Sequence, residues 1–186
     1  KVWCLDASDG RPLWVFAAAP GPEMLLGNGK MISRWPVRTG VIVEDGVAWF
    51  GAGVFPAEGV YLYAVDADDG KLLWKNDSYG RGGQGTVSPQ GYMILSPERL
   101  FVPSGRAMPA AFSRKDGTFL FHRNFSWRDI GMFGGTAGLL SDGLLLTAIE
   151  QVVAVREANG GLAFTEGIPA GAPTDGARQI AVEGDE

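Results

Sequence analysis

The residues best suited to acid–base or thiol chemistry in this 186-residue sequence are its single histidine, His122, and its single cysteine, Cys4. Proton transfer by a histidine needs an acid or a nucleophile within reach, and the sequence places neither beside His122, whose neighbour is Arg123. Cys4 lies between two large apolar residues, which predicts a buried and unreactive thiol. One cysteine and one histidine also exclude an intramolecular disulfide and a His/Cys metal cluster. We expect structural roles for both.

The acidic run at residues 66–70, Asp-Ala-Asp-Asp-Gly, is the segment most similar to a calcium-binding loop. An EF-hand loop has glycine at position six and glutamate at position twelve. Counted from Asp66, Gly70 falls at position five and position twelve is Asp77. This mismatch favours a structural turn over a calcium site.

Two glycine clusters, at residues 80–85 and 27–30, invite comparison with phosphate-binding loops. Neither has the phosphate-loop spacing that ends in Lys-Ser or Lys-Thr. We therefore expect both clusters to be loops.

The composition limits the function classes. Lys and Arg total 16 against 21 Asp and Glu, which gives a net charge of −5, and the sequence pI is about 4.9. This balance argues against partners such as nucleic acids and anionic membranes. No apolar run approaches the length of a transmembrane helix, whereas 46% hydrophobic residues suffice for a folded core.

One pattern recurs four times along the chain: Asp-Gly or Asn-Gly, followed by an aromatic residue four positions after the glycine. The glycines lie 60, 47 and 43 residues apart. The turn glycines are Gly10, Gly70, Gly117 and Gly160, and the aromatic residues are Trp14, Trp74, Phe121 and Phe164.

Each copy predicts a β-hairpin, because Asp-Gly or Asn-Gly between apolar runs supplies the positive φ of a tight turn. Two further strand signals precede each of the last three hairpins, which makes four short antiparallel strands in about 50 residues. Units of this kind are the blades of a β-propeller. The sequence thus predicts an all-β chain that is an incomplete part of a larger propeller. A ring of six to eight such blades needs about 300–400 residues.

The predicted boundaries follow the repeats. We expect a half blade at residues 1–16 and blades at about 36–78, 86–124 and 134–166. Residues 167–186, rich in Gly, Pro and acidic residues, are expected to form a loosely ordered tail.

Residues 64–74 resemble the tryptophan-docking repeat of the pyrroloquinoline-quinone (PQQ)-like propeller family, and residues 5–14 resemble it nearly as well. In that family the terminal aromatic residue packs between adjacent blades. The resemblance therefore implies blade-docking roles for the four aromatic residues and the four turn glycines of the repeats.

The family contains two kinds of member. Quinoprotein dehydrogenases hold PQQ with an adjacent-cysteine disulfide, a calcium ion and a catalytic Asp. Non-catalytic relatives, such as the propeller lipoprotein of the outer-membrane barrel-assembly machinery, bind protein partners. With Cys4 alone, this chain cannot form the disulfide, and no residue matches the calcium or base positions.

The resemblance thus favours a non-catalytic binding scaffold that has no catalytic, cofactor-binding or metal-binding residues. The alternative is the structural portion of a PQQ-dependent dehydrogenase whose PQQ- and calcium-binding residues lie outside this segment. A third class, a propeller hydrolase or lyase, would need a carboxylate or histidine cluster that the sequence does not show.

Five residues are candidates for binding at the channel or rim of the propeller. Arg38 and Gln90 precede the first strands of two predicted blades, and arginine suits anionic groups because its guanidinium donates two parallel hydrogen bonds. Arg81 and Arg106 lie in nearby loops. Phe55 lies in an inserted loop that predicts a protein-docking point.

The expected partners are the remaining blades of the same propeller and a protein or small ligand at the rim. Nucleic acid is not expected as a partner. The family resemblance implies an extracytoplasmic location, in the periplasm or at the cell surface.

Overall fold

The computed structural model divides the chain into two compact units, and each is described by itself. Unit 1 comprises residues 1–90 with residues 115–118, and unit 2 comprises residues 91–114 and 119–186. The described residues are 1–78, 87–105, 107–123, 125, 134–148 and 151–167. Of the predicted tail at 167–186, Gly167 is the last residue of β16, and residues 168–186 lie outside the described residues.

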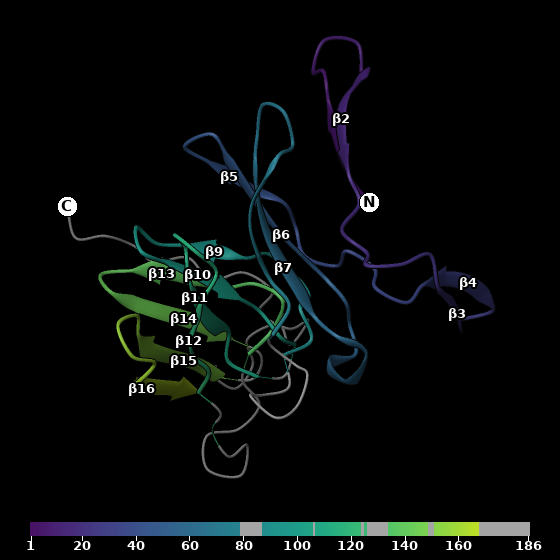
Figure 1. Cartoon of the computed structure of the whole chain (residues 1–186). Coiled ribbons are helices and arrows are strands. Elements are labelled where there is room, and N and C mark those ends of the chain that lie inside the picture. Colours follow the sequence, from purple (N-terminus) through teal and green to yellow (C-terminus); the bar gives the residue numbers. More distant parts are fainter. Residues whose placement is uncertain (79–86, 106, 124, 126–133, 149–150, 168–186) are drawn as a thin grey trace. The chain divides into compact units, whose positions relative to one another are not determined.

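Unit 1 contains two two-stranded sheets and one four-stranded antiparallel sheet (Figure 1). The first pair is β1 (Val2–Leu5) and β2 (Pro12–Phe16), and the second is β3 (Met24–Gly27) and β4 (Lys30–Ser33). The four-stranded sheet has the order β5 (Ile42–Glu44), β6 (Val47–Ala52), β7 (Tyr61–Asp66) and β8 (Leu72–Asn76).

Unit 2 contains two four-stranded antiparallel sheets, each in sequential order. The first consists of β9 (Ile94–Leu95), β10 (Arg99–Val102), β11 (Ala110–Ser113) and β12 (Phe119–Phe121). The second consists of β13 (Leu139–Ser141), β14 (Leu144–Ala148), β15 (Gln151–Arg156) and β16 (Leu162–Gly167). These sheets confirm the predicted all-β units of four antiparallel strands.

The turn between β7 and β8 shows how the repeat pattern makes a hairpin. Gly70 has φ of +73°, which favours glycine, and its N–H donates to the Asp66 carbonyl at 2.9 Å. The Asp66 carboxylate accepts from the backbone N–H groups of Asp68 and Asp69 at 2.8 and 3.2 Å. The acidic run is thus a turn in which the Asp66 carboxylate accepts hydrogen bonds from backbone N–H groups of the same turn.

The core lies on the central strands of the four-stranded sheets, where successive residues are buried on both faces. Phe50 on β6, Phe101 on β10 and Phe112 on β11 are completely buried. In unit 2 the core cluster consists of Phe101, Met108, Ala111, Leu145, Val153 and Val155. Burying side chains of this size typically stabilises a fold by about 1.5–3 kcal/mol each.

The glycine cluster at 27–30 differs from the predicted simple loop, because it is the centre of the additional hairpin β3–β4. Asn28 and Gly29 have φ of +49° and +73°, the two positive values of a tight hairpin turn. The flanking apolar residues form the strands, so the Asn-Gly signal that marks the repeats applied here too. The other cluster, at 80–85, lies outside the described residues.

The helical content of the described residues is one 3₁₀ turn, η1 (Pro56–Glu58). Among these residues no helix is long and apolar enough to cross a membrane.

Candidate functional site

The first repeat aromatic, Trp14, lies against the turn of the next repeat. A Cβ atom added to Gly70 would lie 2.8 Å from Cδ2 of the Trp14 ring. The Trp14 indole N–H also donates to the Ala67 carbonyl at 2.9 Å. A flat ring on a glycine, fixed by one polar contact, joins two segments that are 53 residues apart in the sequence.

Two further aromatic residues make the same kind of contact. Within unit 1 the Trp74 ring lies against Gly117, whose carbonyl accepts a 2.6 Å hydrogen bond from the side-chain amide of Asn76. Within unit 2 a Cβ atom on Gly160 would lie 2.8 Å from the Phe121 ring. The same glycine position therefore receives an aromatic ring in three repeats.

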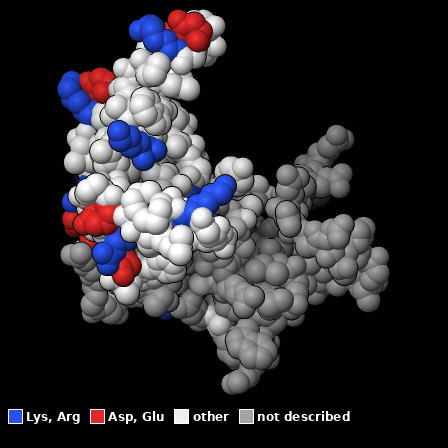
Figure 2. Space-filling view, turned by 90° about the vertical axis from the view of Figure 1, so that its right-hand side faces the viewer, with Lys and Arg blue, Asp and Glu red and all other residues white. Residues whose placement is uncertain are grey.

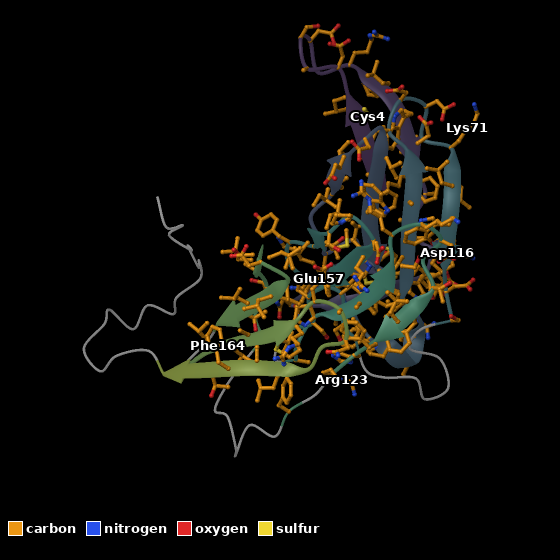
Figure 3. All side chains as sticks on the ribbon, turned by 90° about the vertical axis from the view of Figure 1, so that its left-hand side faces the viewer. Cys4, Lys71, Asp116, Arg123, Glu157 and Phe164 are labelled. Atoms are coloured by element: carbon orange, nitrogen blue, oxygen red, sulfur yellow. The ribbon has the colours of Figure 1, made fainter. Side chains whose placement is uncertain are left out.

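The remaining glycine and the remaining aromatic residue of the pattern have no such contact within the described residues. A Cβ atom on Gly10 would meet no atom within 4 Å. Phe164, on the outer strand β16 in Figure 3, is 44% exposed. Among the described residues, the turn at Gly10 therefore has no aromatic ring against it, and the Phe164 ring packs against no turn glycine of the pattern.

The strand before each turn also differs in exposure between the first repeat and the other three. Seven residues before the turn glycines, the exposed fractions are 53% for Trp3, 5% for Tyr63, 0% for Ala110 and 0% for Val153. Tyr63 is covered because its ring packs edge-on against Phe16, with 5.1 Å between ring centroids. Its hydroxyl donates to the Ala18 carbonyl at 2.8 Å. Trp3 occupies the strand position that is buried in the other three repeats, but it is itself exposed.

The segment that leads into β5 holds Arg38 on a fixed backbone. Val37 forms a β-bridge with Ala52, and the buried Thr39 accepts a hydrogen bond at Oγ1 from the Gly51 N–H at 2.8 Å. Arg38 lies between these two contacts and is exposed. Its guanidinium makes no hydrogen bond or ion pair with the described residues. It is therefore available to an anionic group.

Gln90 lies in the next lead-in segment, and both segments approach Gly51. A Cβ atom on Gly51 would lie 3.2 Å from Thr39 and 3.3 Å from Pro89. Gln90, which follows Pro89, is half-buried. Arg81 and Arg106, the other two rim candidates, lie outside the described residues.

Phe55 is 52% exposed in the loop that joins β6 and β7. Glu58 fixes this loop: its backbone N–H donates to the Phe55 carbonyl at 2.9 Å, and its carbonyl accepts from the Trp35 indole at 2.7 Å. Its carboxylate pairs with Arg34. Sequence reasoning found Phe55 but missed Trp35 and Arg34, because nothing local links them to residue 58.

His122 is half-buried, and Nε2 lies 2.9 Å from the Met108 carbonyl oxygen. Burial lowers the pKa of His122, which favours the neutral ring. Cys4 is half-buried and free. In the described part of the chain no group of three or more His, Cys, Asp or Glu residues could hold a metal ion.

Charged residues form local pairs. Lys71 pairs with Asp69 in the β7–β8 turn, and Arg99 lies 3.3 Å from Glu157 within unit 2. Hydrogen bonds from Lys71 lower the pKa of Asp69. On the described part of the face in Figure 2, basic and acidic side chains alternate without a broad patch of one sign. This surface suits discrete polar contacts better than a polyanion.

The family model described as outer membrane protein assembly factor BamB matches residues 1–179. The chain belongs to this family. A comparison with curated protein sequences found no match.

Solved structures share the β-propeller fold. BamB from Moraxella catarrhalis is 14% identical, with a TM-score of 0.53 over 74% of this chain and 40% of that one. Quinohemoprotein alcohol dehydrogenase ADHIIG from Pseudomonas putida HK5 is 18% identical, with a TM-score of 0.55 over 88% and 31%. A europium-containing methanol dehydrogenase is 15% identical, with a TM-score of 0.52 over 72% and 26%. The chain therefore spans less than half of these proteins.

Proposed function

We propose that this chain is a non-catalytic PQQ-like propeller segment that acts as a binding scaffold. The observation that carries the proposal is that Arg38 and Phe55 are exposed on backbone that hydrogen bonds of the neighbouring Thr39 and Glu58 hold in place. A side chain presented on a fixed segment binds with a smaller loss of conformational entropy than one on a mobile loop. An aromatic ring and an arginine are also the residue types that contribute most at protein interfaces.

The family description supports a protein partner in an extracytoplasmic assembly. It is written for an outer membrane protein assembly factor, and the matched structure from Moraxella catarrhalis carries the same name. We propose that this chain likewise works in the periplasm or at the cell surface. The proposal includes no bound quinone or metal.

We also propose that further blades of the same propeller are partners of this chain. Trp3 and Leu5 are 53% and 52% exposed, whereas the equivalent Tyr63 and Val65 are almost completely buried. The contacts of Tyr63 indicate what would cover Trp3: the outer strand of another blade, with an aromatic ring at the position of Phe16. The aromatic residue of that blade that is equivalent to Trp14 would lie against Gly10.

The alternative function is the structural portion of a quinoprotein dehydrogenase. Two dehydrogenases match the fold as well as BamB does, with TM-scores of 0.52 and 0.55 against 0.53. Under this alternative the residues that bind PQQ and calcium lie outside this segment.

Photo-crosslinking tests the scaffold proposal. A benzoylphenylalanine at position 55 in the protein produced by its host should form a crosslink to one protein of defined mass. The matched control is the same replacement at Leu120, an apolar residue that is 43% exposed on β12. Crosslinking that is equal at both positions, or absent from position 55, would contradict a docking role for Phe55.

A further inference from the structure

The hairpin β3–β4 is apolar on both of its faces. The register pairs Leu26 with Met31 on one face and Leu25 with Ile32 on the other. Leu26 and Met31 are 73% and 61% exposed, and Ile32 is 40% exposed. A hairpin that rests on a core shows one apolar and one polar face. Two apolar faces indicate a ribbon that makes apolar contacts with another segment.

The hairpin lies in a connection that is longer than the equivalent ones. It lies in the connection between β2 and β5, which spans residues 17–41. The equivalent connections after β8 and β12 span residues 77–93 and 122–138, so the first is eight residues longer. The additional residues provide the two strands and leave the neighbouring four-stranded sheet intact.

The base of the hairpin is anchored. The Arg34 N–H donates to the Glu23 carbonyl at 2.9 Å and extends the ladder by one bond. Trp35 is buried, and the Arg34 guanidinium lies 5.4 Å from the centroid of its ring. Arg34 also pairs with Glu58, at the base of the Phe55 loop. The exposed apolar strands therefore start from a fixed point.

The edges of the hairpin suit a third strand. Among the described residues β3 and β4 pair with each other alone, and a two-stranded ribbon is marginally stable in water. An extended peptide that pairs with a free edge gains main-chain hydrogen bonds and places alternate side chains on the two faces. Both faces here offer apolar contact to such side chains.

Two observations decide against other occupants. Asn28 in the turn and Lys30 at the start of β4 are exposed and polar, so insertion into a lipid bilayer would bury polar groups and open strand edges. A second copy of this chain carries a net charge of −5, which opposes self-association. Lys30 makes no ion pair with the described residues, and it matches a partner with a carboxylate near the turn.

We propose that β3–β4 binds an extended, apolar segment of a partner protein as a third strand, with an acidic residue of that segment beside Lys30. This inference rests on the proposed scaffold function and names a second site and the chemistry of its ligand. Leu26 and Met31 provide the apolar contact, and the free edge of β3 or β4 provides the main-chain hydrogen bonds.

The probe is a fluorescein-labelled decapeptide of alternating valine and threonine that ends in two glutamates. Fluorescence anisotropy should show saturable binding to this chain. The double variant Leu26→Ser/Met31→Ser should bind at least about tenfold more weakly. Leu120→Ser serves as the matched control and should bind like the parent. A peptide with proline at its centre, which cannot complete the ladder, should not bind.

Several results would overturn the proposal: no binding of the decapeptide, equal binding by the double variant, or equal binding of the proline peptide. A dimer in sedimentation velocity that the double variant abolishes would assign the face to a second copy instead. Variant-sensitive flotation with vesicles of phosphatidylethanolamine and phosphatidylglycerol would assign it to lipid. If the decapeptide does not bind but the crosslink at position 55 is retained, the binding site on β3–β4 is rejected and the proposed scaffold function still stands.

Discussion

At the scale of single residues, large aromatic side chains with a polar atom connect distant parts of unit 1. The indoles of Trp14 and Trp35 and the phenol of Tyr63 each donate to a backbone carbonyl, 53, 23 and 45 positions away in the sequence. Each ring fills apolar space, and its polar atom fixes the orientation. Connections between strands that are far apart thus depend on a few side chains.

Replacing Tyr63 with phenylalanine removes the hydrogen bond to the Ala18 carbonyl and keeps the ring. We expect a loss of about 1 kcal/mol in the free energy of unfolding near pH 7. Burial raises the pKa of Tyr63 to about 12, from an ordinary value of 10.0. The folded state therefore disfavours the phenolate, and stability is lost as the pH rises from 10 toward 12.

Urea unfolding of the parent and Tyr63→Phe at pH 7 and at pH 11 measures both effects. The difference between the two proteins should shrink at the higher pH, because the phenylalanine variant has no proton to lose. A constant difference across this range would contradict the assignment to Tyr63.

His122 predicts a pH effect in the opposite direction. Burial lowers the pKa of His122 below its ordinary value of 6.5, so the unfolded chain binds the proton more readily. The stability of the parent should fall as the pH decreases from 6.5. His122→Gln, which keeps a polar group near the Met108 carbonyl but cannot be protonated, should lose less stability between pH 7.5 and pH 5. Equal losses in thermal unfolding would exclude His122 as the source.

At the scale of secondary structure elements, a turn glycine can be required for two separate reasons: a positive φ, and close packing of an aromatic ring. Gly46 and Gly70 have almost the same φ, +74° and +73°. A Cβ atom on Gly46 would meet nothing within 4 Å, whereas one on Gly70 would collide with the Trp14 ring. The two positions thus separate backbone strain from the docking of an aromatic ring.

Gly46→Ala and Gly70→Ala form a matched pair within one four-stranded sheet. We expect about 1–2 kcal/mol of destabilisation at Gly46 from the left-handed backbone alone. Gly70→Ala should cost a further 1–3 kcal/mol or so, because Trp14 must move out of close contact. Equal changes in the free energy of unfolding would show that the Trp14 contact does not stabilise the chain.

The sequence predicted the repeated hairpins because their signal is local: an Asp-Gly or Asn-Gly turn between apolar runs. The same signal occurs at Asn28-Gly29, but the glycine cluster at 27–30 was compared only with phosphate-binding loops and was therefore expected to be a simple loop. The contacts of Trp35 and Thr39 could not be predicted, because each joins positions that only the paired strands bring together. The exposure of Phe55 followed from its place in an insertion, but the anchoring of that loop by Glu58 did not.

At the scale of the whole molecule, the family match covers nearly the full chain, whereas the chain covers 40% or less of each solved relative. Two groups of exposed apolar residues have different explanations. Trp3 and Leu5 occupy strand positions that are buried in the other repeats. Leu26 and Met31 belong to the hairpin β3–β4, in a connection that is eight residues longer than the equivalent ones. We propose further blades for the first group and a partner strand for the second.

A titration of the polypeptide encoded by the complete reading frame with PQQ and calcium tests the central claim most directly. A non-catalytic scaffold should show no stoichiometric quinone binding, by absorbance or by thermal shift, and no dye-linked oxidation of alcohols or sugars. Saturable binding of one quinone per chain together with substrate oxidation would contradict the claim. That result would make this segment the structural portion of a dehydrogenase.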